Sequence, residues 1–368
     1  MIKKAVLSFL AVLLLLVGSG TGLVQAGTEL TVRTSSAEMD FPDRLNFSLS
    51  AQSDVNIVDI RLHYTVDRMA HAKVTGEVYI QFAPATSVSE EWVWDMRKTG
   101  GLPPGSSIMY WWTVIDAGGN KIKTEPTIVQ IEDDRYDWRN ITQGNVTIYW
   151  YKGNDDFSRE LMKATQGALA RLAEDTGAEL ESPVKIYIYA NSQDLQGSMI
   201  YPQEWTGGVA FVRYGIIAIG IAPNNLNWGI GAIAHELTHL VIHQATFNPY
   251  SDLPTWLGEG LAMNAEGDLD GQFVASLHKA IEDDNLISVQ SLSSPFSAYA
   301  EESALSYAQS YSIVKFLIES FGPEKMFELL NTFQQGSGYD EALEKVYGFD
   351  MDGLDTRWRS AFKVEQAL

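Results

Sequence analysis

The sequence predicts an α+β protein in which a β-sandwich precedes a region of mixed strands and helices and then a helical region. Hydrophobic residues alternate with period two between about residues 27 and 131, which is typical of half-buried strands. Beyond the acidic run at 132–134, strands alternate with helical segments, and after residue 262 every apolar pattern has the helical period. With 368 residues, the chain is long enough for two domains, which we expect at 27–132 and 133–368.

The first 26 residues have the pattern of a secretory signal peptide. Lys3 and Lys4 precede an apolar run at 5–17, and Val-Gln-Ala at 24–26 forms a small-residue cleavage site. An uncleaved membrane anchor is the alternative, although the apolar run is short for a membrane span. We therefore expect a secreted or extracytoplasmic protein, with signal peptide 1–26 and no stable membrane insertion after its removal.

Composition narrows the chemistry and the partners. The chain has no cysteine, so disulfides and thiolate metal ligands are excluded. Lys and Arg number 26 against 47 for Asp and Glu, a net charge of −21 that argues against nucleic acid or anionic lipid as a partner.

The N-terminal third predicts a sandwich of short strands. About seven strands in roughly 100 residues, separated by Gly- and Pro-containing turns, are typical of an immunoglobulin- or fibronectin-like β-sandwich. His63 falls on the polar face of one strand and His71 in a loop, so we expect both to be solvated rather than to bind metal. The predicted strands are 30–33, 45–51, 58–66, 74–82, 91–95, 108–115 and 122–131.

The second region predicts a small sheet followed by helices. Strands are expected at 146–151, 184–189, 208–214 and 216–221, the last two antiparallel across a turn at Gly215. Helices are expected at 155–177, 192–200, 228–245 and 256–263, and then at 272–282, 303–321, 323–333, 339–346 and 351–362.

The helix predicted at 228–245 contains the pattern on which the functional interpretation depends. Residues 235–239 read His-Glu-Leu-Thr-His, and residues four apart lie on the same face of a helix. His235 and His239 can therefore converge on one metal ion, with Glu236 projecting beside it. Two imidazoles and a carboxylate, with a fourth position left to water, are the ligands of a catalytic zinc.

Glu259 is the predicted third ligand. It lies on the helix expected at 256–263, far enough after His239 for the chain to turn back antiparallel. The alternative is a surface glutamate on an ordinary helix. His243 is a poorer candidate, because eight residues of helix separate it from His235 by about 12 Å, too far for two ligands of one ion. We expect His243 to pack beside the site or to support a ligand, and we expect one Zn²⁺ per chain.

The predicted chemistry is hydrolysis of an amide bond. A zinc ion lowers the pKa of water and polarises a carbonyl, and Glu236 is free to take the proton of that water and pass it to the leaving amine. An oxyanion donor is needed opposite the metal, and Tyr307 is the candidate. Packing in a helical core is the alternative role for this aromatic residue.

These residues resemble a known family of enzymes. His-Glu-x-x-His at 235–239 followed by Trp-Leu-Gly-Glu-Gly-Leu-Ala at 256–262 is similar to the gluzincin metallopeptidases of thermolysin and aminopeptidase-N type, and above all to bacterial peptidase-MA-like proteins. The resemblance covers about residues 146–362. It implies a sheet lobe and a helical lobe with zinc in the cleft between them, and it assigns the oxyanion role to Tyr307.

The resemblance also implies how substrate is held. Gluzincins bind the peptide backbone along an exposed edge strand, and the matching segment carries Gly208, Val209 and Ala210. The acidic element with which aminopeptidases hold a free amine is absent, which favours an endopeptidase acting on peptides or proteins. Met263 replaces the aspartate that orients a zinc histidine in thermolysin-like members, and Asn264 is a possible substitute.

Two other functions are compatible with the sequence. One is a non-catalytic or surface-binding protein that retains the peptidase fold, against which the intact Glu236 argues. The other is a zinc hydrolase of a non-peptide amide, such as a cell-wall crosslink, for which the sequence shows no dedicated feature.

Overall fold

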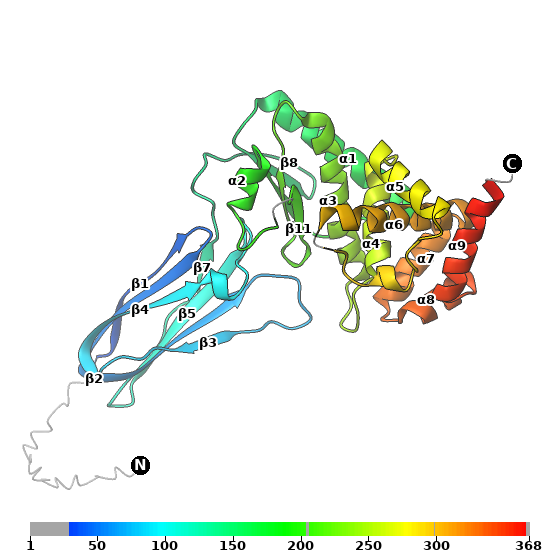
Figure 1. The fold of residues 1–368 in the computed structure, drawn as a ribbon. Coiled ribbons are helices and arrows are strands. Elements are labelled where there is room, and N and C mark those ends of the chain that lie inside the picture. Colours follow the sequence, from blue (N-terminus) through cyan, green and yellow to red (C-terminus); the bar gives the residue numbers. More distant parts are fainter. Residues whose placement is uncertain (1–28, 204–205, 298, 366–368) are drawn as a thin grey trace, which may run out of the picture.

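The computed structural model describes residues 29–203, 206–297 and 299–365. A sheet-rich N-terminal part and a helical C-terminal part lie at opposite ends of the molecule, with a smaller sheet between them (Figure 1). The mixed α and β content agrees with the predicted class. The expected signal peptide, 1–26, lies outside the described residues. Within the part that is described, none of the helices combines the length and hydropathy that crossing a bilayer requires.

The N-terminal sheet is built around one long strand, β2 (Arg44–Val66), in place of the two strands that the sequence predicts. Its first half pairs with β1 and β4 and its second half with β3 and β5. Buried positions are odd-numbered from Leu45 to Ile57 and even-numbered at Ile60 and beyond, and the register against β5 shifts after Ile57. Such an irregularity bends a strand without ending it. It also leaves Val58, predicted to be buried, 38% exposed.

The other strands of this sheet are β1 (Thr31–Asp40), β3 (Gly76–Tyr79), β4 (Ala85–Asp95), β5 (Ser107–Asp116), β6 (Lys121–Lys123) and β7 (Thr127–Gln130). Their buried side chains form one cluster, in which Phe47 and Trp112 are completely enclosed. Ile200 and Tyr214 from the second region pack against the same cluster. The two parts of the chain are therefore in direct contact.

The smaller sheet has five strands in the order β11-β12-β10-β9-β8. The central strand β10 pairs in parallel with β9 and β12, whereas β8 and β11 are antiparallel edges. The antiparallel pair β11 and β12 was predicted, but β11 ends at Phe211 because a 3₁₀ turn follows and leads into Gly215 with φ 64°. Strand β8 was not predicted, since Ile141 is its single apolar residue.

The bounds of these strands are β8 (Arg139–Gln143), β9 (Val146–Trp150), β10 (Val184–Tyr189), β11 (Gly208–Phe211) and β12 (Ile216–Gly220). The helices are α1 (Asp155–Thr176), α2 (Ser192–Gln196), α3 (Leu226–Thr246), α4 (Thr255–Glu266), α5 (Gly271–Glu282), α6 (Ala300–Phe321), α7 (Pro323–Gln334), α8 (Tyr339–Tyr347) and α9 (Met351–Glu365).

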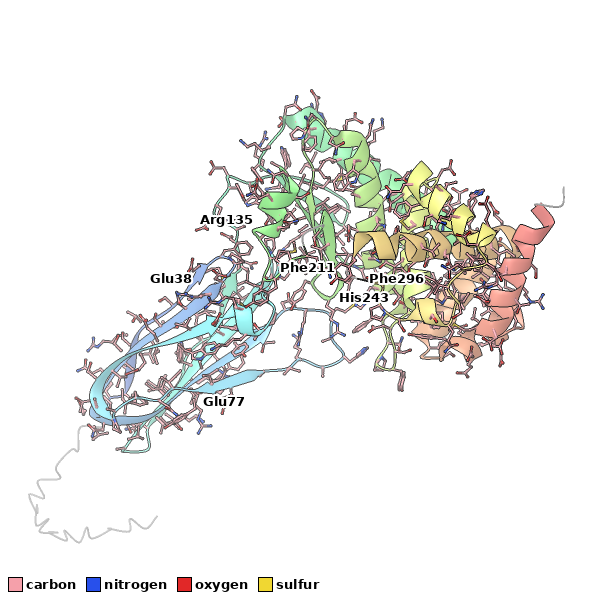
Figure 2. The ribbon with its side chains drawn as sticks, viewed as in Figure 1. Glu38, Glu77, Arg135, Phe211, His243 and Phe296 are labelled. Atoms are coloured by element: carbon pink, nitrogen blue, oxygen red, sulfur yellow. The ribbon has the colours of Figure 1, made fainter. Side chains whose placement is uncertain are left out.

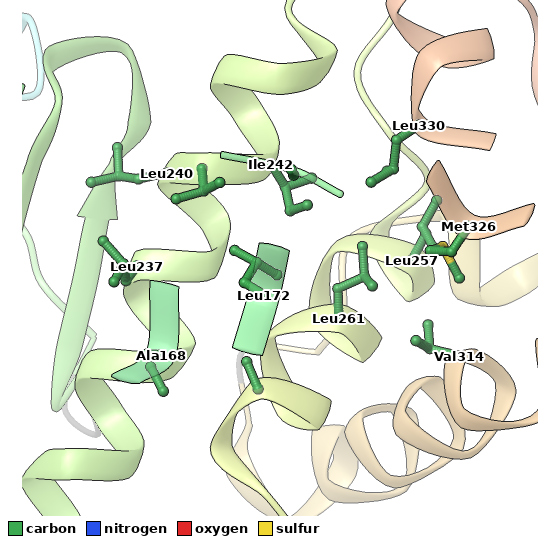
Figure 3. Close-up of a cluster of buried hydrophobic side chains, with 14 of the residues drawn as sticks. Ala168, Leu172, Leu237, Leu240, Ile242, Leu257, Leu261, Val314, Met326 and Leu330 are labelled. Carbon is green, nitrogen blue, oxygen red and sulfur yellow. The ribbon is translucent and has the colours of Figure 1, made fainter. Parts of the chain in front are cut away.

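Helices α1, α3, α4 and α6–α9 share one core with the inner face of the small sheet. Figure 3 shows Leu172 of α1, Leu240 of α3, Leu261 of α4 and Val314 of α6 among the side chains of this core. Because α3 lies between α1 on one side and α4 on the other, the core holds its position relative to both. A helix fixed in this way can carry polar side chains on its remaining face.

Candidate metal centre and active-site cleft

A cleft with a volume of about 860 Å³ lies along the polar face of α3. It is lined by His235, Glu236 and His239 of α3 and by Glu259 of α4. Leu237 and Leu240 of the same α3 turns are buried in the core, so helical periodicity separates the two faces.

The close approach of α4 and α6 depends on Gly260. A methyl group added at this position would lie 2.4 Å from the backbone oxygen of Ser310, so only glycine allows α6 to pack at this distance. The neighbouring residue, Glu259, lines the cleft, and its carboxylate lies beside the histidines of α3.

Three ligand atoms converge at the centre of the cleft. The Nε2 atoms of His235 and His239 lie 3.2 Å apart, and each lies 3.5 Å from Oε2 of Glu259. Ligand atoms at about 2.0–2.2 Å from a tetrahedral zinc ion are separated by about 3.4 Å. Oε2 of Glu259 is buried and has no hydrogen-bond partner among the described residues. The donor set and its spacing therefore fit a zinc ion.

Glu266 fixes the orientation of His235. Its Oε1 lies 2.6 Å from Nδ1 of His235, so Nδ1 faces the carboxylate and Nε2 faces the centre. Glu266 lies seven residues after Glu259, on the same face of α4. The sequence predicts that this helix ends at Met263, which is why Glu266 is not among the predicted site residues.

The centre concentrates negative charge. Burial lowers the pKa of His235, but the neighbouring carboxylates of Glu259 and Glu266 outweigh this effect and raise it to about 10. Burial raises the pKa of Glu259, and the proximity of the two histidines reverses that effect and lowers it. Three carboxylates thus surround two imidazoles, an arrangement that favours a cation.

Glu236 lies beside these atoms but is not one of the three. Burial raises its pKa, against the opposing charges of the two histidines, which makes it a stronger base than an ordinary glutamate. A methyl group added at Gly208 would lie 2.8 Å from Oε1 of Glu236, so the absent side chain leaves space for this carboxylate. Strand β11 therefore passes directly beside Glu236.

Strand β11 also offers an unpaired edge to the cleft. Among the described residues it pairs with β12 alone, and Gly208, Val209 and Ala210 all line the cleft. The outer edge of such a strand presents backbone N–H and C=O groups that a peptide can pair with.

Comparison with known proteins identifies the family. A profile of the peptidase MA superfamily matches residues 164–364, which contain the three convergent ligands and Glu236. The chain belongs to the peptidase MA superfamily. No curated protein matches the chain.

Solved structures show weaker likenesses to this peptidase MA chain. A two-domain M1 zinc metallopeptidase bound to L-arginine is 11% identical over 87% of this chain and 91% of that chain, with a TM-score of 0.37. OgpA from Akkermansia muciniphila is 13% identical, with a TM-score of 0.21, over 28% of each chain. A family 56 carbohydrate-binding module that binds β-1,3-glucan is 17% identical over 28% of this chain and 99% of that chain, with a TM-score of 0.17. At these values the likenesses say nothing about activity.

Tyr307 of α6 lines the same cleft in this peptidase MA chain. Its ring packs edge-on against Phe296, with centroids 5.2 Å apart. Burial raises the pKa of Tyr307, and the charges of Glu259 and Glu236 add to the effect, so its hydroxyl keeps its proton and remains a donor.

Asn264 and His63 do not act as predicted. Asn264 donates to the backbone oxygens of Gly260 and Tyr311, so the prediction that it supports a zinc histidine is wrong; Glu266 occupies that role. His63 is not solvated, since it stacks on Trp111 and contacts Thr113.

Two further histidines lie outside the metal centre. His243 lines the cleft one turn beyond His239, and its buried Nε2 has no hydrogen-bond partner among the described residues. It is not one of the three convergent ligands. His71 lies in the predicted loop and is exposed, but its ring stacks on Phe247.

Proposed function

We propose that this chain is a secreted, zinc-dependent endopeptidase of gluzincin type, related to thermolysin and aminopeptidase N. The observation that carries the proposal is the spacing of 3.2–3.5 Å among the ligand atoms of His235, His239 and Glu259. Membership of the peptidase MA superfamily supports a peptidase-type hydrolase. One zinc ion per chain would be held by these three residues, with Glu266 holding the ring of His235 in place.

The reaction proposed is hydrolysis of a peptide bond. Bound zinc would activate a water molecule and polarise the substrate carbonyl. Glu236 takes the proton of the attacking water, since its raised pKa makes it a stronger base than an ordinary glutamate, and then delivers that proton to the leaving amine. The hydroxyl of Tyr307 donates a hydrogen bond to the oxyanion that develops on the substrate carbonyl.

Substrate would lie along β11. The backbone of the substrate pairs with the free edge of β11 at Gly208, Val209 and Ala210, which places the scissile bond beside Glu236. Binding through backbone groups tolerates many side chains and extends on both sides of the scissile bond. Together with the absence from the sequence of an acidic element for a free amine, this supports an endopeptidase.

The other parts of the chain are proposed to serve export and support. We assign residues 1–26 to a signal peptide, 27–132 to an immunoglobulin- or fibronectin-like β-sandwich and 133–368 to the peptidase domain. Asp133 belongs to the second unit, because its carboxylate accepts hydrogen bonds from Arg135 and from Tyr189 of β10. A peptidase domain produced on its own should therefore begin before Asp133.

The test combines metal analysis with digestion of a mixed peptide library. Purified protein should contain about one zinc ion per chain and cleave internal peptide bonds, and Glu236→Gln should keep the zinc and lose the cleavage. Zinc-free protein, or equal cleavage by the Glu236→Gln variant, would rule the proposal out. Release of single N-terminal residues alone would replace endopeptidase by aminopeptidase.

A further inference from the structure

The cleft follows one face of α3 along nearly its whole length. The residues of α3 that line the cleft follow the helical repeat and lie at positions 228, 232, 235, 236, 239, 242, 243 and 246. At about 1.5 Å per residue, the helix extends about 15 Å from Glu236 to Thr246. An extended peptide advances about 3.3 Å per residue, so four or five substrate residues fit between the scissile bond and this end.

The N-terminal sheet forms the wall at this end of the cleft. The loop between β2 and β3 extends from the sheet toward the helical part (Figure 1). The backbone N–H of Met69 in this loop donates to the oxygen of Arg213 at 2.6 Å. The ring of His71 stacks on Phe247, with centroids 4.1 Å apart and an interplanar angle of 5°.

A pocket with a volume of about 250 Å³ lies between the loop and the end of α3. Met69, Ala70 and His71 line one side, and Arg213 and residues 247–252 line the other. Arg213 and Phe247 also line the main cleft, so the two hollows lie next to each other. His243, which Figure 2 places at the junction of the small sheet and the helices, lies between this pocket and the metal centre.

Arg213 brings a positive charge to this end. Among the described residues that line the cleft or the pocket, it is the only lysine or arginine. The described part of the chain gives its guanidinium no carboxylate partner, although Asp252 lines the same pocket. Burial lowers the pKa of His243; Asp252 raises it and Arg213 lowers it, which places both charges near this imidazole.

The position of Arg213 is set by the substrate strand itself. Gly208 lies beside Glu236, and Arg213 follows five residues later, just after β11 ends. The turn is completed by Gly215, whose φ of 64° favours glycine. A peptide paired with β11 therefore passes from Glu236 toward Arg213.

We propose that the pocket between the β2–β3 loop and Phe247 is an outlying substrate subsite, in which Arg213 selects an acidic side chain four or five residues from the scissile bond. The inference rests on the proposed peptidase function. It makes the N-terminal sheet a part of the substrate site, since its loop supplies one wall.

The test uses the full-length zinc enzyme and peptides that share one cleavage site. An Asp is placed at each position from two to six residues on either side of that site, and each peptide is compared with its Asn counterpart, which keeps the shape and removes the charge. We expect kcat/KM to be about three- to tenfold higher for Asp at one position four or five residues away, since an exposed charged hydrogen bond contributes this much. The preference should shrink as salt is added.

Variants identify the residue responsible. Arg213→Ala should abolish the difference between Asp and Asn peptides, and Arg213→Glu should reverse it toward Lys peptides. Arg171→Glu is the matched control, because Arg171 is exposed on α1 and lines neither hollow. Peptide affinities measured by fluorescence anisotropy in the Glu236→Gln background should follow the same order without any turnover.

Removing the stacking of His71 on Phe247 tests whether the β2–β3 loop forms a wall of the subsite. His71→Ala should raise KM more for peptides long enough to reach the pocket than for short peptides, whereas His71→Phe should restore the KM of the long peptides. His278→Ala, at an exposed position of α5, is the control. A wild-type enzyme that cleaves peptides without any Asp preference, or a preference that survives in Arg213→Glu, overturns the subsite. Failure of the peptidase function looks different, because no peptide would then be cleaved at all.

Discussion

Two carboxylates with buried oxygen atoms, one in each part of the chain, differ in their hydrogen bonding. Asp116 at the end of β5 accepts hydrogen bonds of 2.8–3.0 Å from the hydroxyl of Ser53, the backbone N–H groups of Gly118 and Asn120, and the amide of Asn120. Glu259 in α4 has only two imidazole nitrogens nearby, at 3.5 Å, and its Oε2 has no hydrogen-bond partner among the described residues.

The difference shows which carboxylate belongs to the fold and which to the chemistry. Buried polar groups in native proteins are nearly always hydrogen-bonded, because leaving one unpaired costs free energy. Asp116 meets this rule with donors from its own turn, and the bonds from Asn120 are the first cause of its lowered pKa. Glu259 departs from the rule at a point where two histidines also converge. A cation would supply the missing partner.

The largest difference between substitution of Glu259 and substitution of Asp116 should be in zinc content. Glu259→Ala should reduce zinc from about one ion per chain to near zero and abolish activity, because two imidazoles alone hold the ion weakly. Asp116→Ala should keep the zinc and the activity but lower the melting temperature, since four donors lose their acceptor. Zinc content after dialysis and thermal melting of both variants provide the measurement. Tight stoichiometric zinc in Glu259→Ala would remove the distinction.

Added zinc sharpens the same comparison. A ligand that binds only the folded state raises the melting temperature. Zinc should therefore stabilise chelator-treated wild type and Asp116→Ala by similar amounts and leave Glu259→Ala unchanged. A zinc-induced shift that is lost in Asp116→Ala would place a metal site in the sheet instead.

Glu236 tests whether the carboxylate beside the three ligands has a role different from theirs. Glu236→Gln preserves size but removes the proton acceptor, so turnover should fall about 10²–10⁴-fold while zinc content stays at the wild-type level. Parallel measurement of kcat and zinc content distinguishes a base from a ligand. Loss of zinc together with activity would make Glu236 a ligand.

Tyr307 extends the comparison from charge to hydrogen-bond donation. Tyr307→Phe keeps the packing on Phe296 but removes the hydroxyl, and kcat should fall about 10²–10³-fold with little change in KM. Tyr311→Phe, one turn further along α6, is the control, because its hydroxyl contacts Lys315 and it does not line the cleft. A small change in kcat with a lowered melting temperature would assign Tyr307 to packing.

Local patterns predicted the parts of the site that lie within one helix or strand. The four-residue spacing places His235 and His239 on one face of any helix. The two apolar runs before that helix predicted an antiparallel pair of strands, which β11 and β12 form. Glu259 was the long-range ligand in that prediction, and it depended on a second predicted helix and on enough intervening chain to turn back antiparallel.

The sequence did not predict features set by where elements end and meet. Helix α4 continues three residues past Met263, and those residues bring Glu266 to His235; the spacing of seven after Glu259 was the available signal. Strand β2 was split into two because its alternation changes parity near Val58. The contact of His71 with Phe247 joins segments 176 positions apart, which no local pattern encodes.

Substitution of Glu266 should have the smallest effect of these variants, and Glu266 can be compared directly with Asp116. Its carboxylate is satisfied, like that of Asp116, but its partner is a metal-site histidine rather than the backbone. Glu266→Gln should keep the shape while weakening the hold on the Nδ1 proton of His235, and changes of this kind cost about 10–100-fold in metal affinity or activity. Zinc affinity should be measured by competition with a chelator of known strength.

Asn264→Ala is the control. Among the described residues, Asn264 donates to backbone oxygens, so its loss should lower thermal stability and leave zinc affinity unchanged. Equal zinc affinities in Glu266→Gln and wild type would show that the histidine is oriented by the packing of α3 alone.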